Sequence, residues 1–327
     1  MSDETERLEA ALAGVSGLEG RVAMARVKEG VATVMLDATG LAAEQRAALE
    51  RQVRAATIAL PGITDTRVAM TAEKVPRTIV AIGSGKGGVG KSTVSANIAV
   101  ALGQMGRKVG LIDADIYGPS QPRIMGNASR PELADQQIVP VPTHGVRMLS
   151  IGQLIEPGTA VAWRGPMTAS ALTSLMEGDW GDCEILIVDL PPGTGDVQMT
   201  LIQKWKPAGA VIVSTPQDLS LMDATRAIDM FRKMDVPVIG LVENMAGYLC
   251  PHCGEESDPF GSGGAEAAAR TMAIPFLGRI PLRTSIRQAS DAGLPPAAGD
   301  GEEAELFRTL AVKLLEQLKD PAHAAHS

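Results

Sequence analysis

Short runs of apolar residues recur along the chain from residue 78 onward, separated by longer stretches of mixed polarity. These runs are Thr78–Ile82, Val109–Ile112, Val146–Ile151, Ile185–Leu190, Ala210–Ser214, Val238–Val242 and Phe276–Ile280. Continuous apolar runs of this kind are typical of parallel strands that are buried on both faces. Because helical stretches alternate with them, the pattern predicts an α/β fold with a doubly wound, mostly parallel sheet.

Two of the helical stretches show a stripe of apolar residues at helical spacing. The first stripe, which precedes Gly106, consists of Val94, Ile98, Leu102 and Met105. The second stripe, within Glu302–Lys319, consists of Leu306, Leu310, Leu314 and Leu318. We expect the first helix to end at Gly106, since glycine favours the conformation that ends many helices. The polar side of the second helix mixes charges of both signs, so we expect it to pack against the domain rather than on a membrane surface.

The pattern before residue 75 is different and predicts a small α+β domain. Its expected elements are two strands joined by a turn at Lys28–Gly30, a helix and a third strand, at Val22–Val27, Val31–Leu36, Leu41–Leu60 and Val68–Met70. This part carries no Cys, no His and no glycine-rich loop, and residues 71–77 look like a linker. We therefore expect a small α+β domain over residues 1–75, a large domain over 76–320 and a mobile tail over 321–327.

The composition is that of an ordinary globular protein and excludes several functional classes. The chain has 327 residues, 45% of them hydrophobic, which excludes disorder throughout. Its 30 Lys and Arg against 38 Asp and Glu give a formal net charge of −8, and only 3% of its residues are aromatic. An acidic chain with few aromatic residues is poorly suited to bind nucleic acids or anionic membranes, so we expect neither as a partner.

The expected location is the reducing cytoplasm. No apolar run approaches the roughly 18 residues that a membrane helix needs. The first residues are acidic and have no apolar segment behind them, unlike a secretory signal. Three cysteines in a chain of this length cannot build a disulfide framework.

The clearest chemical signal lies directly after the first predicted strand of the large domain. Its residues are Gly85, Lys86, Gly87, Gly88, Val89, Gly90, Lys91, Ser92 and Thr93, which fit the pattern G-x-x-x-x-G-K-[ST]. Glycines allow backbone N–H groups to turn toward phosphate oxygens, and the following helix presents its positive end to the same anion. Lys91 can reach the β- and γ-phosphates of a nucleotide, and the Ser92 hydroxyl can bind Mg²⁺. We therefore predict a phosphate site of the P-loop type.

Carboxylates follow two of the predicted strands and complete this site. Asp113 and Asp115 follow the run Val109–Ile112, at the strand end where ligands bind in open α/β sheets. Asp189 ends a later apolar run, which is the Walker-B arrangement for Mg²⁺. The glycine- and proline-rich turn at 190–196 is suited to sense a γ-phosphate.

The second lysine of the loop, Lys86, has two interpretations. One lysine is enough to bind the phosphates. Lys86 could therefore act on a phosphate held by a neighbouring subunit, as a cation supplied in trans during phosphoryl transfer. The alternative is an exposed loop lysine without a catalytic role.

These segments resemble a known class of dimerising ATPases. The loop is similar to the deviant Walker A motif of the MinD/ParA/ArsA class, whose signature lysine matches Lys86. A closer resemblance is to the Mrp/ApbC family of iron–sulfur cluster carrier ATPases. The segments that carry it, within residues 78–320, are Gly83–Thr93, Asp113–Ser120, Trp163–Met167, Asp189–Asp196, Glu243–Tyr248 and Cys250–Cys253. The resemblance implies a P-loop ATPase that binds ATP and Mg²⁺.

The resemblance also implies roles for individual residues. In such families the aspartate that matches Asp115 positions the attacking water, and the asparagine that matches Asn244 contacts adenine. A plain alternative for Asn244 is a turn residue that bonds its own backbone. The expected catalytic residues are Lys86, Lys91, Asp115 and Asp189. The small domain resembles a diverged form of the iron–sulfur assembly-type domain fused to bacterial members, which commonly carries a reactive cysteine, and this chain has none before Cys183.

Cys250 and Cys253 stand close enough in sequence to bind one metal centre together. A pair supplies two ligands, whereas zinc and iron–sulfur sites usually need four. Cys183 precedes a predicted buried strand and is expected to be structural, and we do not expect His323 and His326 to take part. Two chains that contribute two thiols each would reach four ligands, which fits a symmetric dimer. The alternatives are a redox-active pair and a zinc-binding pair.

The resemblance implies a homodimer that bridges a [4Fe–4S] cluster and passes it to client apo-proteins, and a scaffold protein could supply the cluster. We predict this function, with ATP hydrolysis coupled to cluster loading or transfer. The alternative is a positioning ATPase of the MinD/ParA type, which predicts a basic C-terminal helix or a basic DNA-binding face, and the chain shows neither. An electron donor like nitrogenase reductase also bridges a cluster, but its cluster cysteines are spread far apart rather than in C-x-x-C.

Overall fold

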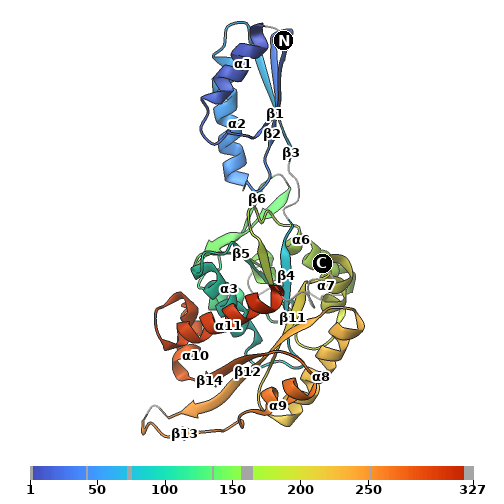
Figure 1. Ribbon diagram of the computed structural model, residues 1–327, viewed down its shortest axis with the longest axis vertical. Coiled ribbons are helices and arrows are strands. Elements are labelled where there is room, and N and C mark those ends of the chain that lie inside the picture. The colour runs from blue at the N-terminus through green and yellow to red at the C-terminus, as the bar shows by residue number, and fades with distance from the viewer. Residues whose placement is uncertain are drawn as a thin grey trace. The chain divides into compact units, whose positions relative to one another are not determined.

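The computed structural model describes residues 3–41, 43–71, 76–134, 136–155, 165–250 and 252–319. Contacts within the chain divide it into two compact units. The small unit is Met1–Pro76 with Asp179–Cys183, and the large unit is Arg77–Gly178 with Glu184–Ser327. Each unit has its own sheet and its own hydrophobic core (Figure 1).

The small unit is a three-stranded sheet covered by two helices. Its elements are α1 (Asp3–Ala13), β1 (Val22–Lys28), β2 (Val31–Asp37), α2 (Ala43–Ile58) and β3 (Asp65–Thr71). The strand order is β1-β2-β3, with β1 antiparallel and β3 parallel to the central β2. The predicted strands and the helix α2 are present, whereas α1 was not predicted. The hairpin turn matches the prediction because Glu29 and Gly30 take φ values of 52° and 75°, the left-handed conformation of the commonest hairpin turn.

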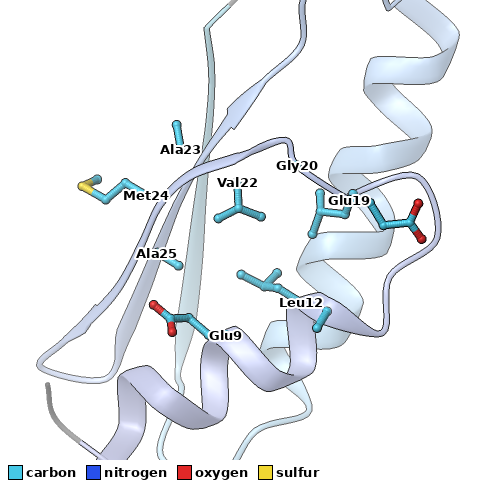
Figure 2. Close-up of a pocket in the computed structure, with 10 residues that line it drawn as sticks. Glu9, Leu12, Glu19, Gly20, Val22, Ala23, Met24 and Ala25 are labelled. Atoms are coloured by element: carbon cyan, nitrogen blue, oxygen red, sulfur yellow. The ribbon is translucent and has the colours of Figure 1, made fainter.

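A pocket of about 450 Å³ lies between α1 and β1 of the small unit (Figure 2). Figure 2 shows Leu12 from α1 and Val22 from β1 pointing toward one another across it. Apolar side chains and two glutamates, Glu9 and Glu19, account for most of its lining. The described lining residues include no Cys, His or Lys.

The large unit is built on a nine-stranded sheet, of which seven strands match the apolar runs. The strands are β4 (Thr78–Gly83), β5 (Val109–Asp113), β8 (Val141–Thr143), β9 (Val146–Ser150), β10 (Ile185–Asp189), β11 (Gly209–Ser214), β12 (Val238–Leu249), β13 (Glu256–Ser257) and β14 (Phe276–Leu282). The order is β13-β12-β11-β4-β10-β5-β9-β8, and β14 pairs with β12. Only β8 and β13 run antiparallel to their neighbours. The prediction of an α/β fold with a mostly parallel sheet is confirmed.

Helices flank this sheet, with α3, α10 and α11 on one side and α7 and α8 on the other (Figure 1). The helices are α3 (Lys91–Gln104), α4 (Gln121–Ile124), α5 (Ile151–Leu154), α6 (Gly165–Met176), α7 (Asp196–Trp205), α8 (Asp218–Lys233), α9 (Gly264–Thr271), α10 (Thr284–Asp291) and α11 (Glu302–Lys319). A 3₁₀ turn at Pro296–Ala298 precedes α11, and a separate ribbon is formed by β6 (Glu132–Ala134) and β7 (Gln137–Val139). None of the described helices is long and apolar enough to cross a membrane.

The two predicted apolar stripes on helices differ in how many of their residues are buried in the hydrophobic core. In α11, Leu310 and Leu314 are buried and the other two leucines of the stripe pack against the same core, so the predicted packing is confirmed. In α3 the first three residues of the stripe are buried, but Met105 follows the last helical residue and is 37% exposed. Gly106, with φ of 81°, ends the helix as expected.

Some predicted boundaries need correction, and some predictions fall outside the described residues. The third run of the large unit ends at Ser150, because the Ser150 side chain accepts from Gly152 N and caps α5. Thr71, which was assigned to a linker, belongs to β3. The predictions for residues 72–75, Trp163 and Arg164, and the tail 321–327 lie outside the described part of the chain.

Candidate functional site

The predicted phosphate loop connects β4 to α3 at the carboxyl end of the parallel sheet. Gly88 and Gly90 both have φ of 80°, a conformation that only glycine adopts without strain. Gly90 is the N-cap of α3, and a Cβ there would overlap the side-chain amide of Asn244. Gly85 packs so closely on α8 that a Cβ would overlap the backbone of Asp223. Gly88 and Gly90 are therefore required by the loop conformation, Gly85 by a close contact with the backbone of α8, and Gly90 also by its contact with the Asn244 side chain.

Lys91 lies at the centre of the site and is paired with Asp189. Its Nζ is 2.7 Å from Asp189 Oδ1, and the two side chains are 6% and 0% exposed. The same Nζ is 3.3 Å from Ser92 Oγ and 4.0 Å from Asp115 Oδ2. Lys91 begins α3 and Asp189 ends β10, a strand that pairs with β4, so the topology brings the two together. The structure thus assembles three predicted site residues, Ser92, Asp115 and Asp189, around the ammonium group of Lys91.

Two further side chains hold the carboxylate of Asp189. Ser95 Oγ donates to Oδ1 at 2.8 Å, and Gln121 Nε2 donates to Oδ2 at 2.9 Å. Gln121 Nε2 also donates to the backbone oxygen of Ser92 at 2.9 Å. Neither residue was expected from the sequence, because neither stands at a motif position that binds a known ligand.

Asp113 is buried and anchors the loop that follows β5. Its Oδ2 accepts hydrogen bonds from the backbone N–H groups of Ser120 and Gln121, at 3.0 Å each, and from Ser150 Oγ at 2.9 Å. Burial and the nearby charge of Asp189 raise the pKa of Asp113 to about 7. The sequence placed Asp113 at the strand end without a role, and the structure shows that it fixes the path of residues 114–121.

Asp115 is the more accessible carboxylate of this loop. Its side chain is 13% exposed, and its Oδ1 accepts from Gly118 N at 3.3 Å. Burial raises the pKa of Asp115, and the ammonium group of Lys91 opposes this shift. A partly exposed carboxylate beside Lys91 is placed to contact a small polar group at the phosphate site.

The remaining loop residues include the second lysine and the turn at 190–196. Lys86 is half-buried, and its backbone oxygen accepts from Ser84 Oγ at 2.9 Å. Its side chain forms no ion pair with any residue that the structure describes. Gly193 N donates to Ser84 O at 2.8 Å, so the 190–196 turn contacts the start of the phosphate loop.

A pocket of about 430 Å³ adjoins the phosphate loop on the side of β12. Gly90 and Thr93 line it from the loop and α3, and Asn244 and Met245 line it from β12. Its far wall is formed by the end of β14 and by α10, with Leu282, Arg283, Ile286 and Arg287. Asn244 lies within a strand and donates from Nδ2 to Val89 O at 2.8 Å, so the interpretation as a turn residue is wrong. The volume and the mixed lining suit a nucleoside.

The predicted thiol pair follows the end of β12, in the turn that leads to β13. Cys250 N donates to Glu255 O and Gly254 N to Cys250 O, both at 2.9 Å, which closes the turn. Cys250 is half-buried and Cys253 is exposed. Hydrogen bonds from Cys253 and His252 lower the pKa of the Cys250 thiol, and the backbone N–H of Cys253 has the largest effect. A thiol whose pKa is lowered in this way is a suitable metal ligand.

The other candidate ligands do not join this pair in the described part of the chain. Cys183 is 1% exposed and belongs to the small unit, in agreement with its expected structural role. His323 and His326 lie outside the described residues. Among the described residues, no group of three or more His, Cys, Asp and Glu side chains is arranged to hold a metal ion. The turn therefore offers two thiols, with Cys253 Sγ 3.9 Å from Glu255 Oε2, and the described residues complete no group of three ligands around a metal ion.

The strand–loop–helix arrangement, with Asp189 at the end of the neighbouring strand, defines a P-loop nucleoside triphosphatase. A family model of the ParA group, described as NUBPL iron-transfer P-loop NTPase, matches residues 75–315, and the chain belongs to this family. An iron–sulfur cluster carrier protein of Deinococcus radiodurans is 42% identical, with 91% of this chain and 89% of the relative covered. The iron–sulfur protein required for NADH dehydrogenase, mitochondrial, of Arabidopsis thaliana is 47% identical over 75% of this chain and 80% of its own.

Solved structures support the same fold. A nucleotide-binding protein from Archaeoglobus fulgidus in complex with ADP matches with a TM-score of 0.61 and 39% identity, covering 70% of this chain and 91% of that chain. The cell division ATPase MinD of Pyrococcus furiosus matches with a TM-score of 0.56 at 24% identity, covering 73% of this chain and 98% of that chain. The MinD likeness supports the fold alone, whereas family membership favours the carrier function over the positioning ATPase.

Proposed function

We propose that the protein is an ATP-hydrolysing carrier that binds an iron–sulfur cluster between two copies of the chain and transfers it to apo-proteins. The observation that carries this proposal is that β12 leads from the nucleotide pocket to an accessible thiol pair. Asn244 lines the pocket, and Cys250 directly follows the end of the same strand. The names of the Deinococcus and Arabidopsis relatives support an iron–sulfur function.

The phosphate site has the ligands that Mg²⁺ prefers, namely oxygen atoms of carboxylate and hydroxyl groups. Ser92 Oγ and the carboxylate of Asp189 would hold the ion. Gln121 Oε1, which is buried at the same place, has no hydrogen-bond partner among the residues that the structure describes, so the site can accept further polar contacts. When bound with the nucleotide, Mg²⁺ neutralises charge on the β- and γ-phosphates.

Nucleotide binding requires Lys91 to change partners. Its ammonium group is bound to Asp189 in this structure, at 2.7 Å. A triphosphate carries more negative charge than one carboxylate and is the usual partner of a P-loop lysine. We propose that Lys91 then binds the phosphates, that Asp115 beside it orients the attacking water, and that Lys86 acts on the nucleotide of the partner copy. Asn244 would contact the adenine in the adjoining pocket.

The cluster is the cargo of this protein, and the chain provides two ligands for it. Cys250 and Cys253 supply two thiolates, and a [4Fe–4S] cluster uses four. If a two-fold axis passes near the turn between β12 and β13, a second copy of the chain supplies the other two thiolates. Because Cys253 is exposed and Cys250 half-buried, the thiols are open to such a partner. The client apo-protein and a scaffold donor would meet the cluster at this same turn.

The positioning ATPase explains fewer of the observations. Its basic C-terminal helix has no counterpart in α11, whose leucine stripe packs on the core of the large unit. It also gives no role to the thiol pair.

All three cysteines are free, and we propose a reducing compartment, the cytoplasm, where thiols persist.

Anaerobic reconstitution with iron and sulfide tests the proposal. We expect a broad cluster band in the UV–visible spectrum and recovery of activity when the loaded protein is mixed with the apo-form of a [4Fe–4S] enzyme. Mg²⁺-dependent release of phosphate from ATP should be slow and measurable in the same preparation. Protein that hydrolyses ATP but takes up no cluster would instead support the positioning function.

A further inference from the structure

Gln121 is a buried side chain at the phosphate site to which the motifs assign no role. It is the first residue of α4 and has no exposed surface. Its Nε2 lies 2.9 Å from the backbone oxygen of Ser92 and 2.9 Å from Asp189 Oδ2. Both neighbours are acceptors, so this end of the amide is the donor. Gln121 therefore bridges the first turn of α3 and the end of β10.

The contact with Asp189 gains importance when Lys91 leaves. In this structure Asp189 receives three donors: Lys91 Nζ and Ser95 Oγ at Oδ1, and Gln121 Nε2 at Oδ2. Once Lys91 binds phosphate, Ser95 and Gln121 are the donors that remain from this set. A buried carboxylate that loses its partners pays a large desolvation penalty and is free to turn. The amide at Oδ2 then fixes the plane of the carboxylate.

The position of Gln121 depends in turn on the loop after β5. The N–H groups of Ser120 and Gln121 both donate to Asp113 Oδ2 at 3.0 Å, which fixes the start of α4. Tyr117 of the same loop is 74% exposed. A movement of this loop would carry the amide of Gln121 with it and change the support of Asp189.

We propose that Gln121 is a positioning residue that holds the carboxylate of Asp189 in the orientation needed to bind the Mg²⁺ of a Mg–nucleotide complex. It acts through Asp189 and does not touch the phosphates. Its own Oε1, which has no partner among the described residues, stays available for a further hydrogen bond in the loaded site. The assignment rests on the proposed nucleotide function.

The test compares binding of ADP with and without Mg²⁺, by calorimetric titration of the full chain. Gln121→Met keeps an unbranched side chain of similar size but removes the donor to Asp189 and to the backbone oxygen of Ser92. One hydrogen bond to a charged group corresponds to roughly tenfold in affinity or more. The measured quantity is the ratio of the ADP affinities with and without Mg²⁺. We expect this ratio to be about tenfold smaller in the variant than in the parent. The affinity for metal-free ADP should stay within about twofold of the parent. Gln121→Leu serves the same purpose if the Met variant does not fold.

Gln153 provides the matched control. It is also a buried glutamine, 6% exposed; its Oε1 accepts from Ser150 N and its Nε2 donates to Ser129 O, and neither contacts Asp189. Gln153→Met should lower the melting temperature as much as the Gln121 variant does and leave the Mg²⁺ effect intact. An unchanged Mg²⁺ effect in Gln121→Met, or an equal loss of metal-free and Mg²⁺-dependent binding, would overturn the assignment. A parent protein without Mg²⁺-dependent nucleotide binding would overturn the proposed function as well.

Discussion

At the residue scale, the buried ion pair of Lys91 and Asp189 has a structural and a functional consequence. The pair spans 2.7 Å and is almost fully buried. Lys91→Ala leaves the charge of Asp189 with only its hydrogen-bond donors, so we expect the free energy of unfolding to fall by about 3 kcal/mol in urea denaturation. The same change removes the main phosphate cation and should abolish ATP binding in calorimetry. ATP hydrolysis at the parental rate in this variant would show that the site is misassigned.

Asp115→Ala is the matched comparison at the same site. Its side chain is more exposed than that of Asp189, and its Oδ1 accepts one backbone hydrogen bond at 3.3 Å. We expect this variant to keep ATP binding and stability and to lose turnover, because the proposed role of Asp115 is to orient the attacking water. Normal turnover, measured as phosphate release, would remove Asp115 from the catalytic set.

The sequence predicts those site residues whose positions a motif fixes. The phosphate loop and Asp189 follow from spacing, because backbone geometry dictates where glycine, lysine and a strand-ending carboxylate must stand. Ser95 and Gln121 could not be found this way. Their contacts with Asp189 depend on the register of β10 beside β4 and on the path of the loop after β5, both of which are tertiary features.

At the scale of elements, the phosphate loop is pressed against α8 at Gly85. A Cβ at this position would overlap backbone atoms of Asp223 and Ala224, which cannot move without shifting the helix. Gly85→Ala should therefore lower the melting temperature and weaken ADP binding, with a stability loss of about 2 kcal/mol. Gly87→Ala is the control for the nucleotide-free protein, since a Cβ there meets only Pro192 Cγ at 3.8 Å. Equal melting temperatures for both variants would contradict the close contact.

The C-terminal helix α11 is held by its leucine stripe. Leu314 has no exposed surface, and Val312 on the same helix is 38% exposed. Leu314→Ala creates a cavity in the core of the large unit and should reduce the free energy of unfolding by about 3 kcal/mol. Val312→Ala should cost less than about 1 kcal/mol. Similar losses in denaturant titrations of the two variants would mean that α11 is not packed as the structure shows.

The apolar pattern predicted the elements of the large unit better than those of the small unit. Strands buried on both faces produce uninterrupted apolar runs, so six of them agree with the predicted bounds to within about two residues, and β12 agrees at its start. The helix Asp3–Ala13 was missed because its apolar side is narrow, and only Leu8 and Leu12 of it are fully buried. The extension of β12 beyond Val242 was also missed, since Glu243 and Asn244 interrupt the run. Both are buried polar residues, which only their tertiary partners explain.

At the scale of the whole molecule, Lys86 tests whether ATP joins two copies of the chain. The side chain is half-buried in the phosphate loop, and its proposed partner is the nucleotide held by the other copy. Lys86→Ala should bind ATP but neither dimerise with it nor hydrolyse it, as measured by light scattering and phosphate release. Mixing it with Asp115→Ala should restore part of the activity, because each mixed dimer has one intact site. Normal turnover of Lys86→Ala alone would identify it as an ordinary loop residue.

The proposed cluster would provide a second link between two copies, independent of the nucleotide. The chain has three cysteines, two of which lie at the turn after β12, so a site of four thiolates requires two chains. Cluster binding gathers deprotonated thiols from both chains and should itself strengthen the dimer. We expect anaerobic reconstitution to give about four irons per dimer, measured by iron analysis and light scattering.

Single substitutions separate this bridging site from other thiol chemistry. Cys250→Ala and Cys253→Ala should each lose the cluster and the cluster-linked dimer, because either change leaves the site with two thiolates instead of four. Cys183→Ala should lose neither, since this thiol is buried in the small unit. ATP hydrolysis should survive all three changes, because the phosphate loop contains none of these residues. Four irons held by a strictly monomeric chain, or loss of the cluster on changing Cys183 alone, would refute the two-chain site.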